Sequence, residues 1–342
     1  MLPSSSYGTR SLHVQAMNRI LVFSPGSAQD QLLLFPSLAA LPSQVDVVAP
    51  PETQEVYNLC PHVNRVIPFD LLTSKGLADW SNLYGVARER EYEAALTVSN
   101  LLSIRMMLWL LGIPVRVGVT GGTGEFLLTH AVPTLDHLPR VLAYRDLLQV
   151  VNASPAQEIA LSIPSSSQKW ANQQLGDESR SETVLLYDET SNRAQSSYGP
   201  NAWVSVIQGL RDRRPGISPV LLESRHNQAW IAQVRDHLAN VPVIRAESFS
   251  QAAAVINKAR ILVTSDNPAL YAGLGTSCAV VGLFGRRKPE LYLPQGDRAI
   301  GLSSNTGTLA DIAPIQVIES IEKVIESTKE VVQSSVLKKA QP

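Results

Sequence analysis

Short apolar runs alternate with helical stretches along the first half of the chain. The run Ile20 to Phe23 is followed by a helix-like stretch from Gln31 to Leu41, and this alternation continues to a helix ending near Val151. Four- to six-residue apolar runs bounded by turn residues are typical of buried strands. The pattern predicts strands over 20–23, 45–48, 63–67, 94–98 and 115–119, with helices over 31–41, 101–111 and 137–151 and a Gly-rich turn over 121–124.

The alternation stops in residues 152–182 and then starts again. That stretch is rich in Ser, Gln, Asn and Pro, which is typical of a connection with at most a short helix. Beyond it we expect strands over 184–187, 219–222, 241–244, 261–264 and 279–284, and helices over 202–212, 230–238, 248–260 and 269–274. A last helix runs from 314 to about 336, with Val317, Ile321, Val324 and Val331 mainly on one face.

Strands that alternate with helices predict an α/β fold with parallel sheets covered on both faces. The restart at Val184 predicts two doubly wound, Rossmann-like halves with a cleft between them, and we expect the last helix to pack back towards the N-terminal half. The predicted parts are a disordered tail (1–16), an N-terminal domain (17–151), a linker (152–182), a C-terminal domain (183–313), and a terminal helix and tail (314–342). Ligands of such sheets bind at the carboxyl ends of the strands, which directs attention to the loops 24–30, 188–200, 265–271 and 285–294.

Composition narrows the class of protein. The 342 residues are 44% hydrophobic and 17% charged, with a net charge of -1, so no basic field attracts nucleic acid. Cys60 and Cys278 lie far apart, which disfavours a zinc site or a disulfide framework and fits a reducing, cytoplasmic setting. The most apolar window, 101–113, is too short to span a bilayer, and residues 1–16 lack the apolar core of a secretory signal.

Motifs in the first half resemble those of family 9 glycosyltransferases, the heptosyltransferase-like enzymes. Members open with a strand, a Ser-rich loop, Gly-Asp, and a Pro six residues after that Asp. Here residues 24–30 end in Asp30, and Pro36 stands at the same distance, although Gln29 replaces the Gly. The stretches 63–67 and 127–133, the second containing His130, also resemble family segments.

The resemblance is strongest near the end of the chain. The family carries a helix, a strand, Asp-(Ser/Thr)-Gly-x-x-His, an Ala/Gly-rich turn, a strand and Phe-Gly. Here a helix and a strand lead to Asp266, and a further strand ends in Phe284-Gly285. This chain departs from the motif at three positions, which are Asn267, Pro268 and Tyr271. The Lys expected in the loop 194–200 is missing, and Asp188 and Glu189 precede that loop, where a diphosphate would favour positive charge.

The resemblance implies a glycosyltransferase B-type fold with two Rossmann-like domains facing a cleft. It further implies an inverting, metal-independent transfer of a sugar, with heptose as one candidate, from a nucleotide-diphosphate donor to a surface-glycan or lipopolysaccharide acceptor, with no cofactor. The implied catalytic base is Asp30. The expected donor-binding residues are Ser265, Asp266, Asn267, Tyr271, Gly285, Arg286 and Lys288, and further cleft residues are Ser24, Gly26, His130 and Thr190.

Structural explanations stand beside each of these roles. Asp30 also suits the first turn of a helix, Pro268 suits the start of a packing helix, Asp266 suits an Asx turn, and residues 286–288 suit a solvated basic loop. Three functions therefore remain open. They are an active cytoplasmic transferase with peripheral contact to the inner membrane, a catalytically degenerate relative that binds a protein partner, and another B-type enzyme such as a nucleotide-sugar epimerase.

Overall fold

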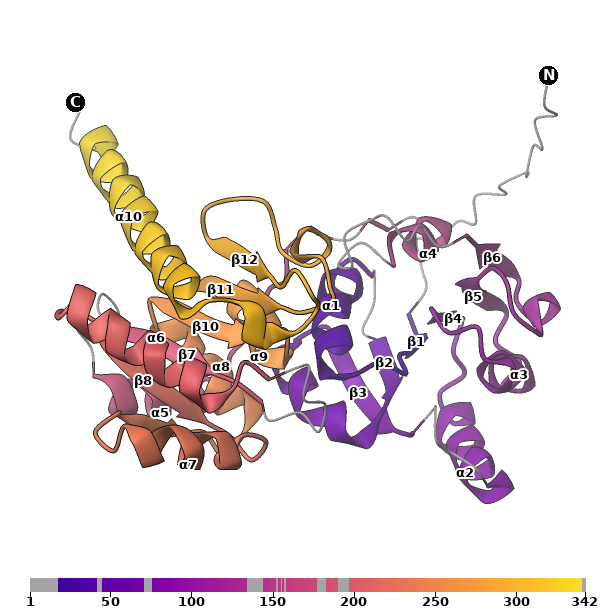
Figure 1. The fold of residues 1–342 in the computed structure, drawn as a ribbon. Coiled ribbons are helices and arrows are strands. Elements are labelled where there is room, and N and C mark those ends of the chain that lie inside the picture. The colour runs from indigo at the N-terminus through magenta and orange to yellow at the C-terminus, as the bar shows by residue number, and fades with distance from the viewer. Residues whose placement is uncertain are drawn as a thin grey trace. The chain divides into compact units, whose positions relative to one another are not determined.

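The computed structural model describes residues 18–41, 45–70, 76–133, 144–151, 153–154, 156, 158–176, 183–189 and 197–339, with side chains of the last helix described to residue 327. Thr190, one of the expected cleft residues, lies outside these ranges. By its contacts the chain forms two compact units, Met1–Ser27 with Leu34–Tyr57 and Pro61–Gln157, and Ala28–Leu33 with Asn58–Cys60 and Glu158–Pro342. Each unit is built around its own six-stranded parallel sheet, as predicted for two doubly wound halves (Figure 1).

The first sheet has the strand order β3-β2-β1-β4-β5-β6. Its central strands are buried along their whole length, because helices or loops cover both faces. The strands are β1 (Ile20–Phe23), β2 (Val45–Ala49), β3 (Val63–Pro68), β4 (Ala94–Thr97), β5 (Val115–Val119) and β6 (His130–Val132). The helices are α1 (Ala28–Ala39), η1 (Pro51–Leu59), α2 (Leu77–Arg88), α3 (Leu102–Leu110), η2 (Glu125–Leu127) and α4 (Arg145–Val150).

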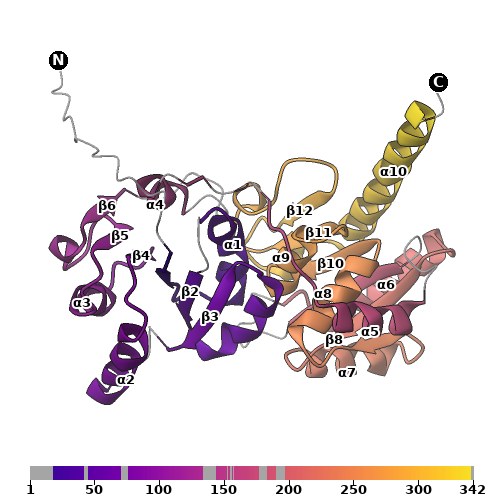
Figure 2. The same cartoon turned by 180° about the vertical axis from the view of Figure 1, so that it is seen from behind.

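The second sheet repeats this plan in the order β12-β11-β10-β7-β8-β9 (Figure 2). Its strands are β7 (Thr183–Tyr187), β8 (Ser218–Glu223), β9 (Val243–Arg245), β10 (Ile261–Ser265), β11 (Ala279–Phe284) and β12 (Ala299–Ser303). Its helices are α5 (Ser165–Leu175), α6 (Pro200–Arg213), α7 (Gln228–His237), α8 (Phe249–Lys258), α9 (Pro268–Leu274), η6 (Pro289–Leu291), η7 (Leu309–Asp311) and α10 (Pro314–Lys339).

Helix α5 lies in the stretch where the sequence predicts a connection with at most a short helix. It has 11 residues and packs on α8, where Ala171 is buried in a cluster with Ala252 and Val255. The Oγ of Ser248 accepts the amide hydrogen of Gln251 at 3.2 Å and caps the N-terminus of α8.

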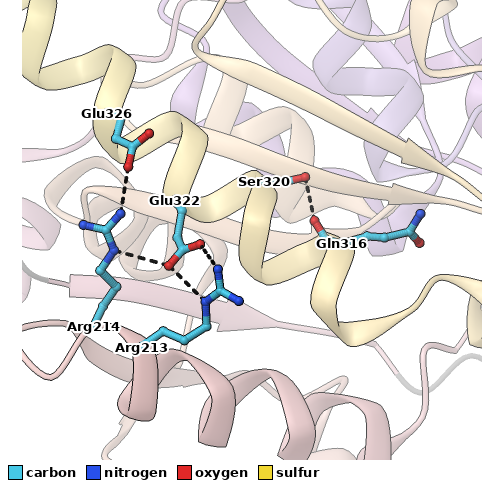
Figure 3. Close-up of polar contacts among 6 residues, drawn as sticks. All are labelled: Arg213, Arg214, Gln316, Ser320, Glu322 and Glu326. Atoms are coloured by element: carbon cyan, nitrogen blue, oxygen red, sulfur yellow. Dashed lines mark hydrogen bonds and ion pairs between the residues drawn. The ribbon is translucent and has the colours of Figure 1, made fainter.

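Helix α10 packs within the second unit, so the expectation that it returns to the N-terminal half is wrong. Val317, Ile321 and Val324 are buried in one core with residues of α6. Gly209 of α6 leaves room for Ile318, whose Cδ1 would lie 2.5 Å from a Cβ at that position. Ion pairs flank this apolar seam. In Figure 3, Arg213 at the end of α6 and Arg214 directly after it both pair with Glu322, and the Nη2 of Arg214 lies 2.8 Å from Glu326. The Oγ of Ser320 donates to the carbonyl of Gln316 at 2.8 Å.

Candidate functional site

The strand order of the second sheet reverses between β7 and β10. Chain order runs outward from β7 through β8 and β9 on one side and through β10, β11 and β12 on the other. The carboxyl ends of strands at such a point are the usual ligand site of an open α/β sheet. Asp188 and Glu189 follow β7 there, Asp266 and Asn267 follow β10, and Gly285 follows β11.

Asp188 is fully buried and joins three elements at this point. Its Oδ1 accepts the hydroxyl of Ser265 at 2.6 Å and the amide of Glu189 at 3.0 Å. Its Oδ2 accepts the indole Nε1–H of Trp203 at 2.8 Å and the amide of Tyr198 at 3.4 Å. Burial disfavours the charged form and raises the pKa of Asp188 to about 6, against the opposing effect of these four donors. Asp188 therefore fixes the end of β10 to β7 and α6.

The loop after β10 is held in place by hydrogen bonds among its own polar groups. The side-chain amide of Asn267 donates to the hydroxyl oxygens of Thr264 at 2.8 Å and Ser265 at 3.1 Å, and its Oδ1 accepts the amide of Ala269 at 2.9 Å. Pro268 has no amide hydrogen to offer. Ser265 and Asn267, both expected to contact the donor, are thus buried and bonded within the loop.

A second cluster lies at the ends of β10 and β11, and we call its members Asp266, Tyr271, Arg287 and Tyr292 the Arg287 cluster. The hydroxyl of Tyr271 donates to the Oδ1 of Asp266 at 2.8 Å, and the Nη1 of Arg287 lies 3.2 Å from the Oδ2. The guanidinium carbon of Arg287 stands 5.2 Å from the ring centre of Tyr292, within cation–π range. Both oxygens of Asp266 therefore have partners.

Burial and neighbouring charge keep this cluster in one ionisation state. Tyr271 is fully buried, and burial together with Asp266 raises the pKa of its hydroxyl far above the ordinary value, so the hydroxyl stays protonated and donates. Partial burial acts to lower the pKa of Arg287, but Asp266, Tyr292 and Tyr271 outweigh it and raise that pKa. Arg287 is a cation at every ordinary pH.

The other expected residues of this loop point elsewhere or lie in solvent. Gly285 is half-buried, and Lys288 is exposed just before η6. The side chain of Arg286 lies along the backbone of Gly307, whose φ of +87° is in the region that favours glycine, and a Cβ there would lie 2.9 Å from the Cγ of Arg286. The sequence singled out Arg286 and Lys288, whereas the structure places Arg287 against Asp266.

The expected residues of the first half occupy separate positions. Ser24 is buried directly after β1, where its amide donates to the carbonyl of Val48 at 3.0 Å, and Gly26 is half-buried in the same loop. Asp30 lies in the first turn of α1 and is partly exposed. His130 is on the edge strand β6, three strands along the sheet from β1, with its Nδ1 3.0 Å from the hydroxyl of Thr129.

Glu223 is a buried acid of the second unit that was not expected from the sequence. Glu223 ends β8, and its Oε1 and Oε2 lie 2.8 and 3.3 Å from the Nε and Nη2 of Arg245. The pair lines an open pocket of about 530 Å³ beside α7, with Gln228 and Arg235 on its wall. In Rossmann folds an acid some residues beyond the first strand of the unit often accepts hydrogen bonds from ribose hydroxyls. The place of Glu223 at the end of the second strand of its unit is the sequence signal that could have identified it.

Among the described residues no group of three or more His, Cys, Asp or Glu side chains is placed to hold a metal ion. Cys60 and Cys278 are both buried and are not joined by a disulfide. None of the helices in the described part of the chain is both long and apolar enough to cross a membrane.

A family model described as glycosyltransferase family 9 (heptosyltransferase) matches residues 83–320. No curated protein sequence matches the chain.

Several solved structures share the fold. A glycosyl transferase family 9 protein from Veillonella parvula matches with a TM-score of 0.76 and 18% identity, over 93% of this chain and 99% of that one. The ADP-heptose lps heptosyltransferase II of E. coli matches with a TM-score of 0.72 and 18% identity, over 91% and 99%. The E. coli heptosyltransferase WaaC with ADP-2-deoxy-2-fluoro heptose matches with a TM-score of 0.71 and 18% identity, over 89% and 99%.

Proposed function

Because this chain belongs to glycosyltransferase family 9 (heptosyltransferase), we propose that it transfers a sugar from a nucleoside-diphosphate sugar to a glycan acceptor. The observation that carries this proposal is the pairing of a carboxylate and a guanidinium, Asp266 and Arg287, at the carboxyl ends of the adjacent strands β10 and β11. This edge of the sheet is where ligands of such folds bind, and it lies within the matched residues.

In the proposed inverting reaction the acceptor hydroxyl oxygen attacks the anomeric carbon of the donor. The bond between that carbon and the phosphate oxygen breaks, and the nucleoside diphosphate leaves with the electron pair. Asp30, in the partly exposed first turn of α1, takes the proton of the acceptor hydroxyl as the general base. The cations that follow β11 stabilise the charge on the leaving diphosphate without a metal ion.

The candidate donor is an ADP-activated heptose. Two of the similar structures are described as heptosyltransferases, one of ADP-heptose and one holding ADP-2-deoxy-2-fluoro heptose. The proposed acceptor is a surface glycan or lipopolysaccharide. Because identity to these structures is 18%, other nucleotides belong in the same screen.

We propose that this protein is cytoplasmic and reaches its acceptor through peripheral contact with the inner membrane. Five of the seven exposed large apolar side chains among the described residues lie on α3 and η2, namely Leu102, Met106, Trp109, Leu110 and Phe126. The guanidinium groups of Arg105 and Arg116 beneath this face bond to backbone carbonyls. The carboxylate of Glu125 on η2 accepts the amide hydrogen of Gly121 and offsets one of these two positive charges, which leaves one. Aromatic and aliphatic side chains over net positive charge suit an anionic bilayer surface. Sedimentation with anionic vesicles tests this, with Trp109→Asp expected to reduce binding.

A catalytically degenerate relative that binds a protein partner is the second candidate. It is favoured by the polar atoms of Ser265, Asn267 and Asp266, all of which have partners within the protein.

A thermal-shift screen of ADP, GDP, UDP and their sugar conjugates separates the two functions, because a ligand of the native state raises its stability by mass action. An active transferase is expected to show at least one stabilising nucleotide sugar. A chain that responds to none of them would support the degenerate relative.

A further inference from the structure

The three consecutive basic residues after β11 are not equivalent. Arg286 extends along Gly307 and Lys288 lies in solvent, whereas Arg287 turns to the end of β10 and pairs with Asp266. The Arg287 side chain is 43% exposed and that of Asp266 is 14% exposed. A ligand arriving from solvent therefore reaches the guanidinium more easily than the carboxylate.

The contacts of the Arg287 side chain orient its guanidinium so that it can bind an anion. The ring of Tyr292 stands 5.2 Å from the guanidinium carbon, and this ring contacts both Tyr271 and Phe284 at centroid distances of 6.4 and 6.3 Å. A guanidinium that stacks on a ring directs its hydrogen-bond donors outward in its own plane, where a planar or tetrahedral oxyanion can bind. The ion pair to Asp266, at 3.2 Å, uses the Nη1 of Arg287, and the side-chain oxygen of Gln29 accepts hydrogen bonds from both Nη1 and Nη2. A diphosphate therefore binds the guanidinium by displacing these two acceptors.

Asp266 does not depend on Arg287 alone. Its other oxygen accepts the hydroxyl of the fully buried Tyr271 at 2.8 Å, so the carboxylate keeps a strong hydrogen bond when the guanidinium leaves. A partly exposed ion pair contributes little to the stability of the protein. Exchanging this partner for a diphosphate, which carries more negative charge, is therefore favourable.

We propose that Arg287 is the cation that binds the donor diphosphate, and that Asp266 competes with the diphosphate for it. The inference rests on the proposed function, since it assigns a phosphate-binding residue to that donor site. In the unliganded protein Asp266 holds the guanidinium beside Tyr292. In the complex the diphosphate takes over the guanidinium, and Asp266 retains Tyr271.

If Asp266 and the diphosphate compete for Arg287, removal of the Asp266 charge should strengthen diphosphate binding, whereas simple loss of a contact could only weaken it. Arg287→Ala is expected to weaken binding of a nucleoside diphosphate by about tenfold or more, the scale of a hydrogen bond to a charged group. Asp266→Asn is expected to tighten it, by up to about fivefold, because the amide oxygen still accepts from Tyr271 but no longer attracts Arg287. In the double variant the gain from Asp266→Asn should vanish, because its target is absent.

Titration calorimetry of the full chain with ADP, GDP and UDP at fixed ionic strength tests the proposal. Arg298→Ala is the matched control. Arg298 is an exposed arginine directly before β12, so it lies at the opposite edge of the sheet, and its removal should leave affinity within about twofold. Thermal melting of each variant checks that the fold is retained.

Each possible result either supports or overturns the proposed competition between Asp266 and the diphosphate. Weaker binding in Arg287→Ala, tighter binding in Asp266→Asn and loss of that gain in the double variant support the competition. Unchanged affinity in a folded Arg287→Ala protein overturns it while leaving the transferase function standing. Equal losses in Arg287→Ala and Arg298→Ala overturn it as well, since net charge alone would then explain both. No binding of any nucleotide by the wild type overturns the proposed donor site and the inference with it.

Discussion

The stability of the second unit should fall as Asp188 ionises. Its pKa rises from the ordinary value of 3.8 to about 6, so between these two pH values the folded protein holds a proton that the unfolded chain has released. Stability then decreases with rising pH, because the native state binds more protons than the unfolded state. This contribution is fully present below pH 3.8 and is lost by the time the pH has passed 6.

The size of the effect follows from the same two values. Each unit of difference in pKa corresponds to about 1.4 kcal/mol, so ionisation of Asp188 costs about 3 kcal/mol of the free energy of unfolding across the window. The perturbation is Asp188→Asn, which keeps the shape of the side chain and removes its titration. We expect the stability difference, wild type minus variant, to fall by about 3 kcal/mol between pH 3.5 and 7.

Urea unfolding followed by tryptophan fluorescence suits this comparison, because Trp203 bonds directly to Asp188 and shares its core with Trp230. Asp188 accepts four hydrogen bonds, which favour the carboxylate, and the account requires burial to outweigh them. A stability difference that rises with pH would mean that the four donors win and that the argument from burial is wrong.

Four further substitutions test the proposed base, the buried arginine of the first unit and the packing of α10. Asp30→Asn should leave nucleotide affinity nearly intact and reduce turnover by about 100-fold or more, as loss of a general base does; equal steady-state rates would remove Asp30 from the mechanism. Arg105→Met should destabilise the first unit by about 3 kcal/mol or more in urea unfolding, since the buried guanidinium serves four backbone carbonyls of the 119–123 loop, and a cost near zero would mean that water replaces it. Ile321→Ala should cost about 2–5 kcal/mol through the cavity it leaves beneath α10. Glu322→Ala should cost far less, because its partners Arg213 and Arg214 are 46% and 32% exposed and ion pairs open to solvent contribute little. The reverse order would mean that the ion pairs, and not the apolar core, hold α10 in place.

The fold was predictable where burial is continuous. Strands β1, β7, β10 and β11 are apolar along their length and buried on both faces, and the apolar runs of the sequence place them correctly. The edge strands β6 and β12 were not predicted, because half-buried residues such as His130 and Gly301 interrupt the apolar pattern.

Helices on the surface were harder to predict for a related reason. Helix α5 is rich in Ser and Gln, and its apolar contacts are limited to Ala171 and the partly buried Trp170 and Leu175, so its composition is that of a connection. The apolar face of α10 was predicted, but its partner was not. Periodicity shows which face of a helix is buried, whereas the partner depends on complementary features such as Gly209 of α6.

The candidate site was likewise predictable from the sequence only in part. Motif order located Asp266 and the basic residues after β11, but the direction of each side chain depends on the loop backbone, and the sequence could not separate Arg286 from Arg287. From the sequence, Asp188 is unfavourable for a diphosphate, because the sequence shows that the residue is acidic but does not show that it is buried. The structure shows instead a buried carboxyl with four donors.

The most direct test of the account is hydrogen–deuterium exchange of the full chain with the nucleotide sugar that raises its melting temperature most. The account predicts slower exchange in the loops after β10 and β11, residues 265–271 and 285–292, where the Arg287 cluster lies, and no change in α5. Stabilisation by a nucleotide sugar with no protection in either loop would contradict a donor site at the ends of these strands.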